Sequence, residues 1–261
     1  MTETDGTDPD ITVGREGSVM VVTMMADRRM NAQRRTFWAA LRDALTEAEA
    51  DSSVRTVVIT GDGDRAFSAG GDIHGYLALE TVGDRRDFIL DCMRTFQAVE
   101  QCSKPVIAAV NGIAFGGGLE LSLACDVIIA SDQARFGVPE ARIGLAPGFG
   151  VYRLLDHLGA GWARYLVYTG EHLDAARAER IGLVQEVVPH AELHERALAL
   201  GERIGQSAPI ALATAKAAIN GGLNTRYLSS VDAIAMLQST EDADEGVVAF
   251  QEKRPPRYEG R

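Results

Sequence analysis

Cysteine is scarce in this 261-residue sequence, and basic residues are outnumbered by acidic ones. The three cysteines, Cys92, Cys102 and Cys125, form no C-x-x-C pair, which predicts a reduced compartment and no disulfide framework. The formal net charge of −11 argues against nucleic acid as the main partner, because phosphate binding needs clustered lysine and arginine. No apolar run is long enough to span a membrane. We therefore expect a cytoplasmic protein that binds neither nucleic acid nor membranes.

Sequence signatures of cofactor, metal and nucleophile sites are also missing. The P-loop pattern G-x-x-x-x-G-K-[ST] does not occur, and G-x-G-x-x-G is absent around the central glycine run. His190 and His194 are four residues apart without the H-E-x-x-H pattern, so a solvated helix face is the simpler interpretation. Residues 62–64 resemble only the start of a calcium loop. Ser68 and Ser122 lack the flanking glycines of a nucleophile elbow, and no Ser/His/Asp order suggests itself. We expect no metal.

The hydrophobic pattern of the first half alternates between strands and helices. The predicted strands are 11–15, 18–25, 54–60, 106–110 and 127–130, and the predicted helices are 37–48 and 84–101. The first two strands form a hairpin, and we expect Asn31 to cap the helix that follows it. This alternation implies an α/β core with largely parallel strands.

Helical spacing dominates the second half of the chain. The apolar residues that carry it lie within 154–155, 165–168, 193–204, 210–219 and 228–237, with a strand-like interruption at 183–188. We expect one compact unit with three parts. These are a disordered acidic tail over 1–10, an α/β core over 11–200 and a helical region over 201–261.

Residues 111–126, N-G-I-A-F-G-G-G-L-E-L-S-L-A-C-D, are the stretch around which the chain is organised. A buried strand leads into three glycines and a short amphipathic segment. The first N–H groups of a helix have no partner within the helix and carry partial positive charge, and glycine lets a ligand approach them closely. Gly117 and Glu120 are three residues apart and share one helix face. The pattern predicts an oxyanion donor beside a carboxylate that can move protons.

A second glycine site lies in A-F-S-A-G-G-D-I, residues 66–73, just after a predicted strand. Open α/β sheets bind ligands at strand ends, but taken alone a tight turn that needs glycine is the simpler explanation. Together with Gly117, the second site suggests two backbone amides that converge on one oxygen, the usual construction of an oxyanion hole.

Two glutamates are candidates for proton transfer. Glu120 lies in the first turn of its predicted helix, where the dipole favours the ionised form, and Glu140 follows Pro139 in a turn-rich segment. If both face one pocket, their like charges raise one pKa and leave one acid and one base. Two unrelated surface carboxylates are an equal alternative, since exposed glutamate is common.

Taken together, these motifs resemble the crotonase (enoyl-CoA hydratase/isomerase) superfamily. The resemblance rests on V-I-A-A-V-N-G-I-A-F-G-G-G-L-E-L-S-L-A-C-D, on A-F-S-A-G-G-D-I before it, on F-G-V-P-E after it and on E-D-A-D-E-G-V-V-A-F-Q-E-K-R-P-P near the end. It covers the chain from about residue 11. It implies a spiral of ββα repeats with a helical C-terminal trimerisation region, assembled as a homotrimer or as a hexamer (a dimer of trimers).

By motif position, the resemblance implies that the amides of Gly71 and Gly117 bind the thioester oxygen of an acyl-CoA. Family hydratases carry both glutamates, so Glu120 and Glu140 become the catalytic pair and favour enoyl-CoA hydratase activity. Coenzyme A is part of the substrate, and no separate cofactor is implied.

The same resemblance implies a binding surface for the CoA part of the substrate. Residues 69–74 would border adenine and pantetheine, with the basic pair Arg28 and Arg29 nearby, and a C-terminal lysine would approach the CoA phosphates. The implied substrate-binding positions are Ala32, Ala69, Asp72, Ile73, His74, Gly116, Pro139, Gly148 and Lys253.

The chain departs from the family pattern after Pro147, where G-F-G-V-Y-R-L is one residue shorter than the frequent G-x-G-G-[ST]-x-R-L. This segment helps to wall the acyl pocket, so the departure bears on substrate shape and on the placement of Glu140. His74, where many relatives carry Lys or Leu, is a smaller difference. Two alternatives stay open beside the hydratase. One is an enoyl-CoA isomerase or another crotonase-type lyase or hydrolase, and the other is a non-catalytic acyl-CoA-binding subunit.

Overall fold

The computed structural model describes residues 9–72, 75, 81–143, 145–221, 241, 242, 245, 249 and 252–261. Ile73, His74 and the helix predicted over 228–237 lie outside the described residues, as does most of the tail assigned to residues 1–10. Within the described part, no helix is both long and apolar enough to cross a membrane.

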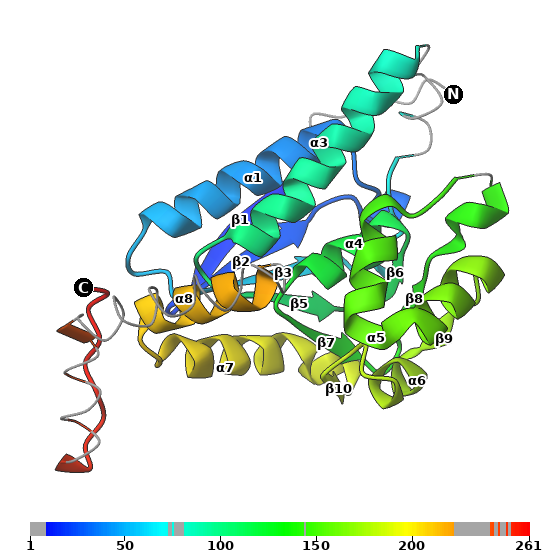
Figure 1. The fold of residues 1–261 in the computed structure, drawn as a ribbon. Coiled ribbons are helices and arrows are strands. Elements are labelled where there is room, and N and C mark those ends of the chain that lie inside the picture. The colour runs from blue at the N-terminus through cyan, green and yellow to red at the C-terminus, as the bar shows by residue number, and fades with distance from the viewer. Residues whose placement is uncertain are drawn as a thin grey trace.

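Six strands of the described chain form the larger sheet (Figure 1). They are β1 (Ile11–Glu16), β2 (Val19–Met24), β3 (Thr56–Gly61), β5 (Val106–Val110), β7 (Val127–Ser131) and β10 (Glu186–Val188), in the order β1-β2-β3-β5-β7-β10. The hairpin predicted at the start is confirmed, because β1 and β2 pair antiparallel. Every later pairing in this sheet is parallel, as the alternation of predicted elements implied.

A smaller sheet lies beside the first and consists, among the described residues, of four short strands. These are β4 (Ala66–Ser68), β6 (Ile113–Phe115), β8 (Arg135–Gly137) and β9 (Leu173–Asp174), in the order β4-β6-β8-β9. The chain visits the larger sheet at β3, β5 and β7 and crosses to the smaller sheet immediately after each of them. This confirms the predicted spiral of ββα units.

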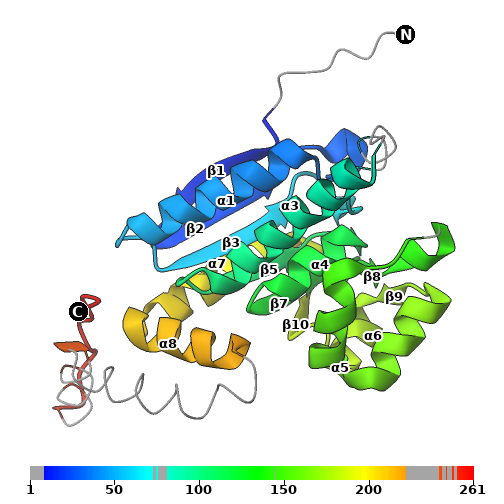
Figure 2. The same cartoon turned by 45° about the horizontal axis from the view of Figure 1, so that its top comes forward.

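Helices cover both faces of the larger sheet (Figures 1 and 2). On one face lie α1 (Arg35–Ala50) and α3 (Val82–Gln101), and on the other lies α7 (Leu193–Gly205). The other helices are α4 (Gly117–Ala124), α5 (Gly148–Thr169), α6 (Ala175–Arg180) and α8 (Pro209–Asn220), and the short 3₁₀ turns are η1 (Asp27–Arg29), η2 (Pro139–Ile143) and η3 (His190–Glu192). The boundary that we placed at residue 200 falls within α7, and the three-part division stays a prediction.

The residues of β2 show why the central strands read as continuous apolar runs. Met20, Val22 and Met24 belong to the core beneath α1 and α3, whereas Val19 and Val21 belong to a second core beneath α7. A strand buried on both faces has no polar side, so its sequence does not alternate.

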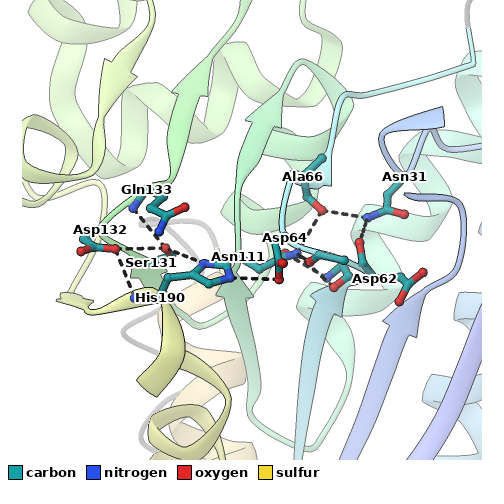
Figure 3. A network of polar contacts seen from close by, with 11 residues as sticks. Asn31, Asp62, Asp64, Ala66, Asn111, Ser131, Asp132, Gln133 and His190 are labelled. Carbon is teal, nitrogen blue, oxygen red and sulfur yellow. Dashed lines mark hydrogen bonds and ion pairs between the residues drawn. The ribbon is translucent and has the colours of Figure 1, made fainter. Parts of the chain in front are cut away.

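Asn31 is not a helix cap, contrary to our expectation. Helix α1 begins at Arg35 after Arg34, and Arg34 makes no side-chain capping bond. Asn31 instead has a φ of 52°, a left-handed conformation that asparagine tolerates better than most residues. Its side chain accepts from the Ala26 amide at 3.0 Å. It also donates to the carbonyl of Ala66 at 2.7 Å (Figure 3). The asparagine thus ties the loop before α1 to the start of β4.

Asn111 performs a similar task from the end of β5. Its amide donates to the carbonyls of Gly61, Gly63 and Ala66, and its oxygen accepts from the Gly61 amide (Figure 3). The side chain is 6% exposed, so these bonds satisfy polar groups that have left water. Two asparagines therefore fix the β3–β4 connection, and with it the position of the glycine segment after β4.

Candidate active site

The site is built at the carboxyl ends of three neighbouring strands of the smaller sheet. Strands β4, β6 and β8 pair parallel to one another. Gly70 and Gly71 follow β4, Gly116 and Gly117 follow β6, and Glu140 follows β8 in η2. Since the carboxyl ends of parallel strands meet at one edge, segments far apart in sequence come together there.

The two glycine segments lie in direct contact. A Cβ atom placed on Gly70 would lie 3.2 Å from the Gly117 nitrogen, and one placed on Gly117 would lie 3.3 Å from the Gly71 nitrogen. Gly70 and Gly116 have φ values of 105° and 52°, which side-chain-bearing residues rarely adopt. The structure therefore brings the two predicted amide segments side by side, and glycine is required for both their conformation and their closeness.

The two amides differ in how they are presented. Gly117 is the first residue of α4, so its N–H has no acceptor within the helix. Gly71 is exposed, whereas Gly70 before it is buried. The Gly71 side of the pair is therefore open to solvent.

Glu120 is buried against the beginning of another helix. Its side chain is 7% exposed, and Oε1 accepts a 2.7 Å hydrogen bond from the amide of Gly150, in the first turn of α5. A side chain at Gly150 would crowd Glu120, because a Cβ there would lie 3.1 Å from Glu120 Cγ and 3.2 Å from Oε1. The glycine permits the close approach that this hydrogen bond requires.

Burial raises the pKa of Glu120 from 4.5 to about 7. The hydrogen bond from Gly150 acts in the opposite direction, the negative charge of Glu140 raises the pKa further, and the amide of Phe149 lowers it. We expected the dipole of its own helix to favour the ionised form of Glu120. Loss of water outweighs this effect, so the net shift of the pKa is upward.

Glu140 lies in η2, with its carboxyl group against Gly116. A Cβ on Gly116 would lie 2.8 Å from Glu140 Oε1. The other oxygen, Oε2, is buried and has no hydrogen-bond partner within the described part of the chain. Burial raises the pKa of Glu140, and its own backbone amide partly opposes the shift. The two glutamates thus approach the glycine segment at 116–117, and neither is an isolated surface carboxylate.

The predicted substrate-binding positions lie in several different parts of the chain. The Ala69 amide donates to the Met30 carbonyl at 2.9 Å, which places residues 69–72 alongside the segment that holds Ala32. Asp72 is half-buried, Gly148 begins α5, and Pro139 begins η2. Ile73 and His74 lie outside the described residues, and Lys253 is exposed near the C-terminus. These positions keep their predicted roles as predictions.

A serine, a histidine and an aspartate do come together in space, although sequence order did not suggest them. The Ser131 hydroxyl lies 3.0 Å from His190 Nδ1, and His190 Nε2 lies 3.1 Å from an Asp64 oxygen (Figure 3). Ser131 is fully buried, so its hydroxyl cannot reach a substrate. The three residues connect β7 and η3 with the β3–β4 loop. The described residues also contain no cluster of histidine, cysteine, aspartate or glutamate that could hold a metal ion.

Known proteins resemble this chain in sequence and in fold. The sequence model of the enoyl-CoA hydratase/isomerase family matches residues 14–261. The chain belongs to this family.

Relatives of this enoyl-CoA hydratase/isomerase family member align over nearly the whole chain. The short-chain-enoyl-CoA hydratase of Clostridium acetobutylicum is 39% identical over 250 residues, which cover 94% of this chain and 95% of the relative. The crotonyl-CoA hydratase of Syntrophomonas wolfei is 37% identical and covers 95% of this chain and 97% of its own. A crystal structure of an enoyl-CoA hydratase from Bacillus anthracis superposes with a TM-score of 0.91 at 36% identity, covering 97% of this chain and 100% of its own.

Sequence reasoning missed two residues of the site in this family member. Gly150 stands in the G-F-G that we noted as a departure, but nothing in its spacing links it to Glu120, 30 residues earlier. Gln33 contacts both glycine segments, and no local pattern distinguishes it from other polar residues before a helix. Both contacts depend on how distant segments meet in the fold.

Proposed function

We propose that this protein is an enoyl-CoA hydratase, which adds water across the 2,3 double bond of an enoyl-CoA thioester. One observation carries the proposal: the adjacent amide segments at Gly71 and Gly117 lie beside two carboxyl groups, one buried and one half-buried, whose pKa values are both raised. The relatives named as short-chain and crotonyl-CoA hydratases support the same reaction.

In the proposed reaction, the amides of Gly71 and Gly117 donate to the thioester oxygen. As water adds to C3, the electron pair of the double bond moves toward that oxygen, which becomes an enolate. Fixed backbone donors stabilise this charge without having to reorganise, and loss of one such donor typically costs about 3 kcal/mol. The site needs no further electrophile for this step.

The two glutamates supply the proton transfers. Glu120 in its ionised form takes a proton from water as the water oxygen bonds to C3, and the Gly150 amide holds its carboxylate in place. Glu140 in its protonated form gives a proton to C2. A base with a pKa near 7 is half-ionised at neutral pH, where general base catalysis is most effective. The pKa of Glu140 is shifted upward by burial, which is the direction that a proton donor requires.

The rest of the proposed substrate lies along the segments 69–72 and 28–33. Ala32, Ala69 and Asp72 would border the CoA portion, and Arg28 and Arg29, both exposed in η1, would meet its phosphates. No separate cofactor takes part in this proposal, since coenzyme A arrives with the substrate.

We also propose that the chain assembles as a homotrimer or a hexamer and acts in the cytoplasm. Helix α5 presents Val151, Tyr152 and Leu155 with 41%, 67% and 48% of their surface exposed. Large apolar side chains grouped on one helix are typical of contact surfaces between subunits. Sedimentation of the purified protein would test the assembly.

A direct assay tests the reaction. We expect the purified protein to remove the conjugated-thioester absorbance of crotonyl-CoA, and 3-hydroxybutyryl-CoA should form in equal amount. A double bond that moves from C3 to C2 without uptake of water would favour the isomerase instead. Tight acyl-CoA binding with no turnover of any enoyl thioester would favour the non-catalytic subunit.

A further inference from the structure

The backbone of Gln33 brackets the first of the two amide segments. Its amide donates to the Gly70 carbonyl at 2.8 Å, and its carbonyl accepts from the Asp72 amide at 3.0 Å. Gln33 and Gly71 thereby form an isolated parallel β-bridge. The exposed Gly71 thus lies between two backbone hydrogen bonds to a single residue.

The side chain of the same residue reaches the second amide segment. Gln33 Nε2 donates to the Gly117 carbonyl at 3.0 Å, and Oε1 accepts from Trp38 Nε1 at 3.5 Å. The orientation of the amide group follows from its neighbours, because an indole N–H only donates and a carbonyl only accepts. The residue is 1% exposed, so the side chain is held by these partners and not by water.

We propose that Gln33 is a positioning residue that sets the distance between the Gly71 and Gly117 amides. The inference rests on the proposed function of these amides as donors to the thioester oxygen. Gln33 touches no reacting atom in this account. It acts through the two glycine segments that it connects.

The chemistry of the segments explains why such a connection matters. Gly70 and Gly116 have left-handed φ values, and glycine-rich backbone has more conformational freedom than any other. Backbone donors stabilise an enolate only if they are already in place when its charge develops. A buried side-chain amide that bonds one segment while its backbone bonds the other removes the freedom that would separate them.

The kinetic test uses Gln33→Met, which keeps the length of the side chain and removes the donor. We expect kcat for crotonyl-CoA hydration to fall about 10- to 100-fold, because displacement of catalytic groups by a fraction of an ångström to an ångström has effects of this size. KM should change less than threefold. Ser122→Ala is the matched control, since it removes a buried 2.8 Å hydrogen bond from the same helix α4 without touching either amide segment. The control should keep the wild-type kcat.

A spectroscopic test reads the amide pair without any turnover. Acetyl-CoA labelled with carbon-13 at the thioester carbonyl has no double bond to hydrate, and donors to its oxygen lower the carbonyl stretching frequency. We expect a lowered frequency on binding to the wild-type protein and a much smaller shift on binding to Gln33→Met. If Gln33→Met does not fold, Gln33→Glu keeps the length and, when protonated, one O–H donor, and its shift should be intermediate.

The outcomes separate this inference from the proposed function. A normal shift and a normal kcat in a folded Gln33→Met protein would overturn the role of Gln33 and leave the hydratase proposal standing. No shift in the wild-type protein would overturn both, since the amides would then not bind the thioester oxygen. A shift that is lost in Gln33→Met but kept in Ser122→Ala supports the positioning role.

Discussion

Glu120 and Glu140 approach the same glycine segment from two differently constructed regions. Glu120 belongs to a buried helix and is held by the beginning of a second helix through a 2.7 Å bond from Gly150. Glu140 belongs to a 3₁₀ turn, is half-buried and has a buried oxygen without a partner among the described residues. One carboxyl group is fixed by the protein, whereas the other has a free position for a proton or a substrate atom.

This difference fits the proposed division of labour between base and acid. A base that activates water benefits from a fixed carboxylate, because the attack direction is set by its position. An acid must reach a carbon atom that the substrate brings in, and hydrogen bonding to its ionised form would lower its pKa and leave less of it protonated at neutral pH. Burial raises the pKa of both groups, but only Glu120 receives a stabilising hydrogen bond from another helix.

The largest effect is expected from Glu120→Gln and Glu140→Gln. Each substitution keeps the shape of the side chain and removes one proton-transfer group, so each should lower kcat for crotonyl-CoA hydration by about 10²- to 10⁴-fold. An isomerase needs only one carboxylate, and Glu120→Gln would then leave the shift of a 3,4 double bond largely intact. Steady-state assays of both reactions with both variants decide between them. If either variant hydrates crotonyl-CoA at the wild-type rate, the two glutamates do not act as a catalytic pair.

The second prediction concerns the free energy of unfolding of Glu120→Gln, measured with urea at pH 5 and pH 8. Because the folded pKa lies above the unfolded value of 4.5, the folded state binds more protons between pH 4.5 and 7. The free energy of unfolding of the wild-type protein therefore falls as pH rises through this range. At pH 8 the ionised buried carboxylate costs about 3 kcal/mol, which glutamine avoids. The stability gain of the variant should grow with pH.

The control for this measurement is Glu47→Gln, at an exposed position of α1. Its effect on the free energy of unfolding should be small and similar at the two pH values. If the Glu120→Gln difference is the same at pH 5 and pH 8, burial does not raise the pKa of Glu120.

Local sequence patterns predicted the parts of the site that local backbone geometry determines. The three-residue spacing of Gly117 and Glu120, the strand before them and the glycines at 70–71 each follow from one segment read alone. The strand order β4-β6-β8, which brings Glu140 to the same edge, was implied only through the family resemblance.

Local sequence patterns did not predict the contacts between segments that are distant in the sequence. The bond from Gly150 to Glu120 and the burial that raises the pKa of Glu120 both arise from the packing of α5 on α4. Asn31 fits a capping pattern, yet its left-handed backbone serves the β3–β4 connection instead. A capping residue and a loop-fixing residue use the same side-chain chemistry, and only the fold distinguishes them.

A smaller effect is expected from Gly150→Ala, which tests how firmly the Glu120 region is fixed. The added Cβ would lie 3.1 Å from Glu120 Cγ, so the carboxylate must move by a few tenths of an ångström. We expect kcat to fall about 10-fold, with little loss of stability because alanine favours the helix by about 1 kcal/mol. Gly161→Ala in the same helix is the control, since nothing lies within 4 Å of its Cβ position. Gly161→Ala should raise stability and leave kcat unchanged. If Gly150→Ala has the same kcat as Gly161→Ala, the position of Glu120 can shift without loss of activity.

The smallest effect is expected in the Glu140 region, from Arg142→Met. Arg142 donates twice to the Thr169 carbonyl at the end of α5, at 2.8 and 3.2 Å, and so braces η2. Because the arginine is exposed, its bonds to this helix end contribute about 1 kcal/mol, and we expect kcat to fall about threefold as Glu140 becomes less well placed. Arg180→Met, which removes an exposed arginine of α6, should leave kcat unchanged. If the loss arises through Glu140, Arg142→Met should have no further effect in a Glu140→Gln background. A loss of the same size in that background would mean that the brace acts on the Glu120 region instead, and the two regions would then not be independent.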